Sequence, residues 1–441
     1  MKRRALLFIL LLAVAAASAT AAFRKEDVKV FTLDNGLKVL LLEDHALPNV
    51  SLYTFFRVGS RNERPGLTGV SHFIEHMMFN GTPKIGPGEF DRRMEFVGGA
   101  NNAYTGDDMT AYLDWFPAAA LEAMIAMEAD RIQGASFDPQ VFESERQVIA
   151  SERRMAVENN NDSLLNENVR ATAIMAHPYH WDVIGWMSDI LGWKRDEVIT
   201  YYRTYYAPSN AVLVLAGDFD GPKAMDLIKK YYGPIPKGTP PPAVTTVEPP
   251  QMGTKRVLIR KEAQAPSFLA VWHSPSAVSP EFFPLSILER ALLNGESSRL
   301  YRRLVREEQL AIDVYGGAGE TLDPQLFFIQ VKPRPDADLD RIEAVIEEEL
   351  AKVKSAGLTD AEFQKALNMI RSDFYFGQQS VNGRANALGQ AELLYGGFEK
   401  IFERMNAYAA VKKDAIRETA AKIFTESNKT VGKLIPEGGA K

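Results

Sequence analysis

A proline-rich stretch near the middle of the chain places the strongest constraint on its fold. Residues 238–250 contain Pro240, Pro241, Pro242, Pro249 and Pro250. Proline lacks a backbone N–H and fixes φ, so this stretch can form neither a helix nor a central strand and is expected to be extended. It leaves two segments of similar length. The sequence therefore predicts one domain at residues 23–237, a linker at 238–254 and a second domain at 255–441.

The two segments contain matching patterns. An apolar helical stretch that ends in Asn-Gly at residues 71–81 aligns with another at residues 285–295. The Pro-Ser-Asn before the strand at 211–216 aligns, at nearly the same spacing, with the Glu-Ser-Asn before residues 430–434. This favours a duplicated domain. The alternative is chance similarity, because apolar helices resemble one another.

Apolar periodicity predicts both strands and helices in the first segment. Residues 31–43 form two apolar runs around an Asp-Asn-Gly turn, which is typical of a hairpin. Further strands are expected at 51–58 and 211–216. Helical spacing appears at residues 67–79, 117–132, 138–158, 163–175 and 195–206. The chain is therefore expected to belong to the α+β class.

The N-terminus has the pattern of a secretory signal peptide. Three basic residues, Lys2 to Arg4, precede an apolar run to about Ala17, and small residues follow. This predicts a signal peptide at residues 1–22, cleaved between 19 and 22, and export to the periplasm if the organism is Gram-negative. The alternative is an uncleaved anchor, although the run is short for a membrane span. No membrane association is expected after cleavage.

Composition excludes several classes of protein. The chain has no cysteine, so disulfides, thiolate zinc sites and cysteine nucleophiles are absent. The formal charge is -6 and no basic block lies outside the extreme N-terminus, so nucleic-acid binding is not expected. There is no glycine-rich phosphate loop. A metal held by side chains would have to use carboxylates and the six histidines.

The chemistry is concentrated in a His-x-x-Glu-His segment. His72 and His76 are four residues apart in a helical stretch and therefore share one face, where two imidazoles can bind one cation. Glu75 borders the same face and can accept a proton from water at the metal. An otherwise apolar helix has little reason to bury these groups without a metal. The alternative is that they are ordinary core residues.

A third ligand is predicted on the helix at 138–158. Glu145 and Glu152 are two turns apart on one face of this helix. Glu152 could complete a set of two histidines and one glutamate, with Glu145 orienting the ligands or shuttling protons. The alternative is a solvated helix face.

Several stretches of the sequence resemble the inverzincin peptidases, the family of pitrilysin, insulinase and the mitochondrial processing peptidase. Residues 69–82 resemble the family's active-site helix, and residues 98–105 resemble its substrate-pairing edge strand. Further similar stretches are residues 145–152, residues 201–218 and the pair 297–300 with 306–308. The length resembles that of the short bacterial members, which have two domains per chain.

The resemblance implies a fold and an activity. It implies two homologous domains of the LuxS/mitochondrial-processing-peptidase type, each with a mainly antiparallel sheet packed against helices, which form half of a clamshell chamber. The implied activity is zinc-dependent endoproteolysis of unfolded peptides, with one zinc per chain. The implied ligands are His72, His76 and Glu152, with Glu75 as general base and then acid.

Strand addition is the implied mode of substrate binding. Asn102, Ala103 and Thr105 would pair with the substrate backbone. Either Asp107 or Asp108 could orient a zinc-bound histidine, and the alternative is that both are surface residues.

One departure from the family pattern concerns the second domain. Active members use an Arg and, seven residues later, a Tyr to hold the substrate, whereas Arg306 is followed at that distance by Asp313. Tyr315 is two residues late, which is about 6–7 Å along a strand. We therefore expect a homologous partner subunit to supply this pair. The alternative is a homodimer in which Tyr315 substitutes through a bulge.

Two other functions remain compatible with the fold. The first is a non-catalytic chamber subunit, and the second is a periplasmic peptide-binding protein that uses the same cavity without metal. A second metal site at His177 and His180 is a weaker hypothesis, because the two histidines also fit simple packing in a loop. His45 and His273 are expected to be structural.

Overall fold

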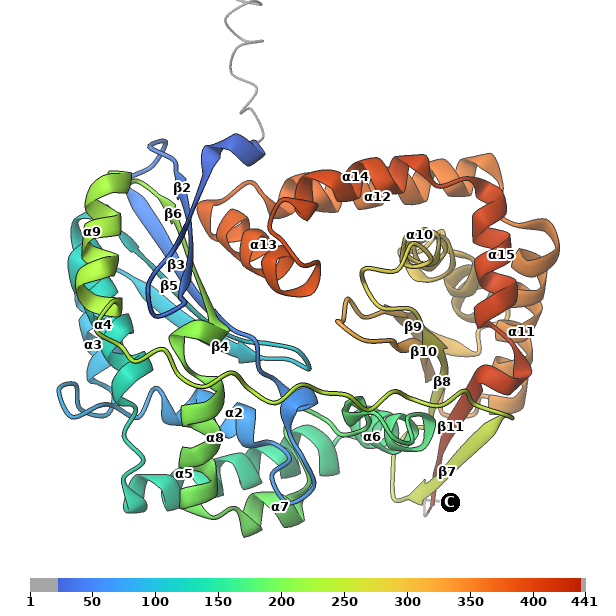
Figure 1. Cartoon of the computed structure of the whole chain (residues 1–441). Helices are drawn as coiled ribbons and strands as arrows, with labels where there is room; N and C mark the ends of the chain where they lie inside the picture. The colour runs from blue at the N-terminus through green and yellow to red at the C-terminus, as the bar shows by residue number, and fades with distance from the viewer. Residues whose placement is uncertain (1–22, 438–441) are drawn as a thin grey trace, which may run out of the picture.

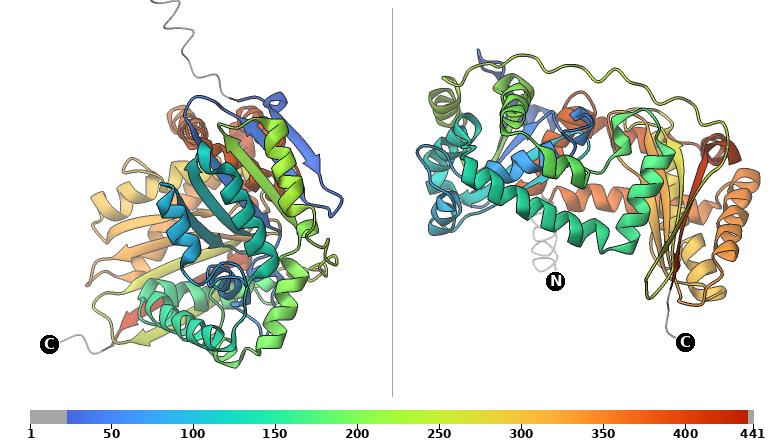
Figure 2. Two further views of the ribbon diagram at one scale, coloured as in Figure 1. Left: turned by 90° about the vertical axis from the view of Figure 1, so that its left-hand side faces the viewer. Right: turned by 90° about the horizontal axis from the view of Figure 1, so that it is seen from below.

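The computed structural model describes residues 23–437, so the predicted signal peptide lies outside the described range. Two β-sheets stand apart in the molecule, each with helices on both faces (Figure 1). Between α9 (Gly221–Tyr232) and β7 (Lys255–Lys261) the chain has no helix or strand, and Figure 2 (right) shows this extended segment crossing from one half to the other along one face. No helix within residues 23–437 has the length and apolar character of a membrane span.

The first sheet has six strands in the order β1-β2-β6-β3-β5-β4. The predicted hairpin is present, with β1 and β2 antiparallel around a turn in which Gly36 has φ 86°. Strands β2 and β6 are parallel, and the remaining pairs are antiparallel. The strands are β1 (Val28–Thr32), β2 (Lys38–Glu43), β3 (Asn49–Phe56), β4 (Ala100–Thr105), β5 (Thr110–Pro117) and β6 (Ala211–Gly217).

Helices of the first half cover one face of this sheet and extend below it (Figure 1). Except for α6 (Asn161–Ala173), which packs on the second sheet, their apolar residues form one continuous core with the first sheet. The helices are α2 (Val70–Met77), α3 (Glu89–Phe96), α4 (Leu121–Gly134), α5 (Pro139–Arg153), α6 (Asn161–Ala173), α7 (Met187–Gly192), α8 (Arg195–Tyr205) and α9 (Gly221–Tyr232).

The second sheet has five strands in the order β7-β11-β8-β10-β9. Its strands are β7 (Lys255–Lys261), β8 (Ser267–Ser274), β9 (Ala311–Ala318), β10 (Gln325–Pro333) and β11 (Lys429–Pro436). Its half also contains the helices α10 (Phe282–Leu293), α11 (Leu339–Ala356), α12 (Asp360–Gly377), α13 (Val381–Leu394), α14 (Lys400–Ala410) and α15 (Lys413–Ile423).

The two sheets have the same topology. When β2, β6, β3, β5 and β4 are matched to β7, β11, β8, β10 and β9, the order of strands is identical. The single parallel pair, β2 with β6, corresponds to the parallel pair β7 with β11. Helix α2 lies in the chain between β3 and the edge strand β4. Helix α10 lies between the matching strands, β8 and β9. The predicted α+β fold of two homologous domains is confirmed.

One helix of each half packs on the sheet of the other half. Helix α13 lies against β3 and β6, where Leu388 and Leu393 join a core that contains Leu40 and Phe55. Helix α6 lies against β8 and β11, where Leu165 shares a core with Leu434. Figure 1 shows α13 beside the first sheet and α6 below the second. Each sheet is therefore completed by a helix from the opposite half.

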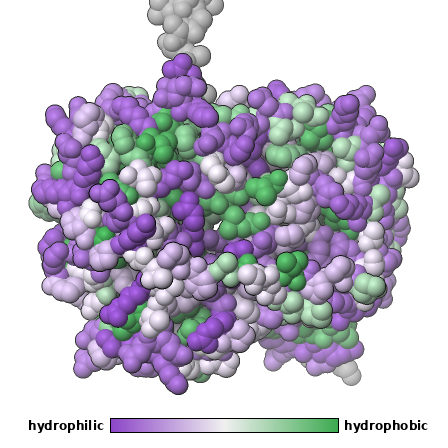
Figure 3. All heavy atoms as spheres, viewed as in Figure 1, coloured by the Kyte–Doolittle hydropathy of each residue, from purple (hydrophilic) through white to green (hydrophobic). Residues whose placement is uncertain are grey.

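A polar bridge joins the halves close to the end of β4. Asp323, in the loop between β9 and β10, binds Arg61 at 2.5 Å and His177 at 3.0 Å. The backbone N–H of Leu322 donates to Asp108 at 3.0 Å. The loop of the second half thereby supports the segment that follows the edge strand of the first. The face in Figure 3 is mainly hydrophilic, with scattered apolar side chains.

Candidate metal centre

Gly69 and Glu63 hold the N-terminus of helix α2 in place. Gly69 precedes it with φ 82°, which glycine adopts without strain. The buried carboxylate of Glu63 accepts hydrogen bonds from the backbone N–H groups of Gly69 and Ser71, at 2.7 and 2.8 Å. Burial raises the pKa of Glu63 to about 8, against the effect of these two bonds. Sequence reasoning missed Glu63 because it lies too far before the helix to match a local capping pattern.

The two faces of α2 have different roles. Val70, Phe73, Ile74 and Met77 are fully buried in the first core, and the Phe73 ring packs against Phe142 of α5 with centroids 4.8 Å apart. This packing holds α2 against α5, so that His72 and His76 face Glu152 of α5. Glu75, on the same helix, bonds instead to Thr105 of β4.

Two histidines of α2 and one glutamate of α5 converge. Nε2 of His72 lies 3.9 Å from one Glu152 oxygen, and Nε2 of His76 lies 3.8 Å from the other. One ligand atom from each of the three residues lies within 4.8 Å of the other two. Ligand atoms of one tetrahedral zinc lie about 3.4 Å apart. The three groups are too distant to bond one another, yet close to the spacing that a shared divalent cation requires, so they fit the predicted zinc.

Glu145 holds His76 in its orientation. Its carboxylate lies 2.8 Å from Nδ1 of His76, and it also accepts a hydrogen bond from Asn80 at 3.1 Å. The bond with His76 lowers the pKa of Glu145. Since Nδ1 is engaged in this bond, Nε2 of His76 is left facing Glu152. A carboxylate behind a metal-binding histidine typically fixes the ring in this way.

His72 is held neutral. Burial, followed by the nearby His76, lowers the pKa of His72 to about 3. Its Nδ1 is buried without a hydrogen-bond partner. Neutral imidazole is the form that binds metal ions, so the environment of His72 favours the ligand state at neutral pH.

Glu75 lies beside this group. Its carboxylate is buried and accepts a hydrogen bond from the Thr105 hydroxyl at 2.5 Å. Burial raises its pKa above the ordinary range of a glutamate, which favours the neutral carboxyl more than solvent does. The contact with Thr105 was not foreseen from the sequence, where Thr105 was predicted only to pair with substrate backbone.

Strand β4 presents an edge next to α2. Within residues 23–437 it pairs only with β5, at one border of the sheet. Asn102 and Ala103 lie in this strand, three and two residues before Thr105. The geometry is compatible with the predicted strand addition, and the substrate-binding roles of these residues stay predictions.

The predicted Arg306 and Tyr315 pair is not assembled within the chain. Arg306 forms an ion pair with Glu296 and lies over the ring of Tyr301. Tyr315 packs edge-to-face on Phe328 of β10, with Lys332 near its ring. The register of β9 against β10 shifts next to Asp313, so a bulge does precede Tyr315. No described hydrogen bond or ion pair joins Arg306 or Tyr315 to the residues of the metal centre.

Asp107 and Asp108 bind neither of the partners that the sequence suggested, which were a zinc-bound histidine and surface solvent. Asp107 binds Arg170 at 2.6 Å, and Asp108 accepts a hydrogen bond from Tyr179 at 2.6 Å. Their described bonds do not include His72 or His76, and Asp108 is buried rather than at the surface. Both instead belong to the bridge between the halves.

His177 and His180 do not form a second metal group. The Nδ1 of His177 accepts a hydrogen bond from the backbone N–H of Tyr179, and its Nε2 lies 3.0 Å from Asp323. His180 packs against Trp181. Within residues 23–437, the only group of three potential metal-binding residues is His72, His76 and Glu152.

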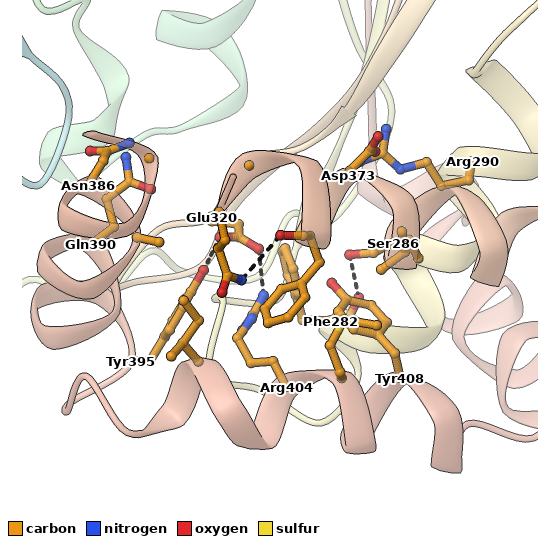
Figure 4. A pocket seen from close by; sticks show the side chains of 18 of the residues that line it. Phe282, Ser286, Arg290, Glu320, Asp373, Asn386, Gln390, Tyr395, Arg404 and Tyr408 are labelled. Carbon is orange, nitrogen blue, oxygen red and sulfur yellow. Dashed lines mark hydrogen bonds and ion pairs between the residues drawn. The ribbon is translucent and has the colours of Figure 1, made fainter. Parts of the chain in front are cut away.

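The second half carries a degenerate counterpart of this centre. On α10, which matches α2, Ser286 and Arg290 stand where α2 has His72 and His76. Nη2 of Arg290 lies 3.2 Å from Asp373 of α12, the counterpart of α5. Figure 4 shows this pair beside Ser286 at the edge of a cavity of about 470 Å³. The guanidinium of Arg290 thus stands in the position that corresponds to the His76 imidazole.

Two related α+β domains, of which only the first has a His-His-Glu group among residues 23–437, are the arrangement expected of the inverted-motif metallopeptidases. Residues 38–185 match the family model described as "Insulinase (Peptidase family M16)", and residues 192–370 match the one described as "Peptidase M16 inactive domain". The chain belongs to the M16 peptidase family.

Named relatives agree with this assignment. The chain is 28% identical to the zinc protease PqqE of Helicobacter pylori, over 92% of each chain. It is 25% identical to an uncharacterized zinc protease, YmxG, of Bacillus subtilis, over 90% of this chain and 96% of the relative.

Solved structures show the same fold. A protease from Helicobacter pylori matches with a TM-score of 0.89 and 26% identity, covering 93% of this chain and 99% of that one. The periplasmic protease PqqL from Escherichia coli matches with a TM-score of 0.76 and 18% identity, covering 95% of this chain but 48% of PqqL. At that identity the likeness concerns the fold alone. In fold, this chain therefore corresponds to half of PqqL.

Proposed function

We propose that this chain is a zinc-dependent endopeptidase that hydrolyses unfolded peptides. The observation that carries the proposal is the convergence of His72, His76 and Glu152 on one point, with the buried carboxyl of Glu75 beside it. These three residues would hold one zinc ion per chain. A zinc ion so held supplies a Lewis acid for the scissile carbonyl and lowers the pKa of water toward about 7.

Residues of the chain have separate roles in proton transfer and in positioning. Glu75 accepts the proton of the attacking water and passes it to the leaving amine, since its raised pKa suits both steps. Thr105 holds the Glu75 carboxylate through its hydroxyl. Glu145 keeps His76 turned toward the metal position. The contacts Thr105–Glu75 and Glu145–His76 support the two positioning roles.

An extended substrate fits the free edge of β4. Asn102, Ala103 and Thr105 would offer backbone groups to a peptide strand, which brings its carbonyls past α2. An unfolded peptide can pair along its whole length in this way, whereas most strands of a folded protein are already paired with their neighbours. Unfolded segments and peptides are therefore the expected substrates.

A second subunit is expected to complete the site. Arg306 is engaged by Glu296, and Tyr315 packs against Phe328, so the substrate-holding pair is not formed within one chain. PqqL contains twice the length of this fold in a single chain. We propose that a homologous partner supplies the Arg and Tyr from the opposite side of a closed chamber. A homodimer that uses Tyr315 is the alternative. The N-terminal pattern supports export to the periplasm.

The competing function is a non-catalytic chamber subunit on the same fold. The unassembled pair in the second half favours it, whereas the complete His-His-Glu group in the first half speaks against it. Metal content and turnover separate the two functions.

The experiment compares the purified wild-type chain with Glu75→Gln. Elemental analysis is expected to find about one zinc per chain in both, because Glu75 is not a ligand. Peptide cleavage is expected only in the wild type, and it is measured alone and after addition of a sister subunit. Turnover by Glu75→Gln would exclude Glu75 as the base. Full activity of the chain alone would exclude the need for a different partner, and zinc without turnover in any combination would favour the non-catalytic subunit.

A further inference from the structure

Strand β4 is held by the second half of the chain as well as by its own sheet. Neighbouring side chains of a strand point to opposite faces, so Tyr104 and Thr105 have different partners. The Thr105 hydroxyl donates to Glu75 of α2 at 2.5 Å. On the other face, the Tyr104 hydroxyl donates to Oδ1 of Asn386 at 3.1 Å. The same hydroxyl accepts a hydrogen bond from Nε2 of Gln390 at 3.3 Å.

Both partners of Tyr104 belong to α13, the helix that the second half contributes to the first sheet. Asn386 and Gln390 are four residues apart and therefore share one face of this helix. Figure 4 shows the two side chains on their helix, at the opposite end of the cavity from Arg290 and Asp373. The Tyr104 ring packs against the core that α13 forms with the first sheet, so the ring is held as well as its hydroxyl.

Few other contacts fix the position of β4. It is an edge strand, and within residues 23–437 it pairs only with β5. None of its residues, Ala100–Thr105, is fully buried, so the strand has no deeply buried side chain to anchor it. Tyr104 is therefore one of the few side chains that tie β4 to another element. A shift of Tyr104 also moves Thr105, because a rigid peptide unit joins the two residues.

We infer that Asn386 and Gln390 are positioning residues for the metal centre, which act through Tyr104 to fix β4 relative to α2. The inference rests on the proposed endopeptidase function and deepens it, because it assigns part of the control of the site to the second half of the same chain. With Tyr104 in place, the Thr105 hydroxyl stays within reach of Glu75. A peptide paired with β4 then keeps one position relative to the metal ligands.

Loss of these bonds should affect turnover more than binding. A loosened β4 still offers its backbone groups to a peptide, so substrate affinity is largely kept. The carbonyl to be cleaved and the Glu75 carboxylate are then no longer aligned. The expected result is a lower kcat with little change in KM.

A double-mutant cycle measures this effect, with the sister subunit present in every assay. Tyr104→Phe removes the hydroxyl, and Asn386→Leu removes its acceptor at nearly constant volume. We expect each variant to lower kcat about 3–10-fold, the range for one neutral hydrogen bond, with KM changed less than about twofold. The double variant should be at most about twofold slower than the slower single variant, because both changes break the same bond. Gln390→Leu breaks the longer bond and should have a smaller effect, and the zinc content should not change in any variant.

Two further variants serve as rescue and control. In Asn386→Asp a carboxylate oxygen still accepts the hydrogen bond from Tyr104, so kcat should lie within about twofold of the wild type. Tyr395→Phe is the matched control, because it removes a hydroxyl from the same cavity but from a bond with Glu320. Its kcat should equal that of the wild type.

The kinetic constants separate positioning from a purely structural role. A structural role alone would lower the thermal midpoints of Tyr104→Phe and Asn386→Leu but leave kcat unchanged at temperatures where both are folded. That result overturns the inference and leaves the endopeptidase function standing. An equal loss in Tyr395→Phe, or additive losses in the double variant, also overturns it, because the effect would not pass through this bond. Absence of cleavage by the wild type, alone and with a sister subunit, would instead remove the endopeptidase function and the inference with it.

Discussion

Replacement of Gly389 by alanine tests how tightly the two halves are joined. Gly389 lies within α13, the helix that the second half contributes to the first sheet. A Cβ at this position would lie 2.5 Å from Cζ of Phe55 on β3 and nearer still to two other ring atoms. Phe55 is fully buried and stacks on Tyr53 with centroids 5.3 Å apart, so its ring has no free space into which to move.

Two effects of opposite sign compete in this variant. Alanine is favoured over glycine inside a helix by about 1 kcal/mol. Carbon atoms pack best at about 3.5–4.0 Å, so the new methyl must displace the helix or the ring by about 1 Å or more. Overpacking of a close-packed core costs about 1–3 kcal/mol, and here it exceeds the helical gain. The upper part of this range applies because the nearest ring atoms would lie far inside normal contact, so we expect a net loss of about 1–2 kcal/mol. For a chain of this length such a loss lowers the thermal midpoint by about 1–2 °C.

Differential scanning calorimetry of the mature chain measures this shift. Gly377→Ala is the control, because Gly377 ends α12 and a Cβ there meets nothing within 4 Å. That variant should be as stable as the wild type or slightly more so. If Gly389→Ala proves as stable as Gly377→Ala, then α13 does not pack on β3 as described, and the argument for exchanged helices fails.

Three further predictions follow from contacts near the metal centre and between the halves. Glu145→Gln should weaken zinc binding about 10–100-fold, measured by competition with a chromogenic chelator, because His76 loses its charged partner; unchanged affinity would contradict this role. The pKa of Asp323 is lowered to about 2, first by its hydrogen bond with His177 and then by Arg61. Its ionised form therefore stabilises the fold above about pH 4, and the midpoint difference between Asp323→Asn and wild type should shrink as the pH falls toward 2; a difference independent of pH would exclude this bridge. Residues 23–237 expressed alone should show no cooperative thermal transition by circular dichroism, since the first sheet lacks α13; a sharp transition would show that this half folds unaided.

Local elements of the fold could be predicted from the sequence. The hairpin around Gly36 and the helix that carries His72 follow from patterns that span only a few residues. The spacing of His72 with His76, and of Glu145 with Glu152, also fixes which side chains share a face. These features are set by backbone periodicity, which the sequence contains directly.

Long-range partners could not be predicted in this way. The apolar stripes of α6 and α13 indicate that one face of each helix is buried, but not that the buried face meets the sheet of the other half. The roles of Asp107 and Asp108 depend on Arg170 and Tyr179, which are distant in sequence. Only the folded arrangement brings these groups together.

The exchanged helices also affect how the chain can be made. The last strand of the first sheet ends at Gly217, but α13 begins only at Val381, about 160 residues later. At roughly 5–20 residues per second, ribosomal synthesis of that interval takes about 10–30 s. Throughout this time the apolar surface around Leu40 and Phe55 has no native cover. The nascent polypeptide is thus exposed to aggregation until its synthesis is nearly finished, and this interval is where a molecular chaperone would engage it.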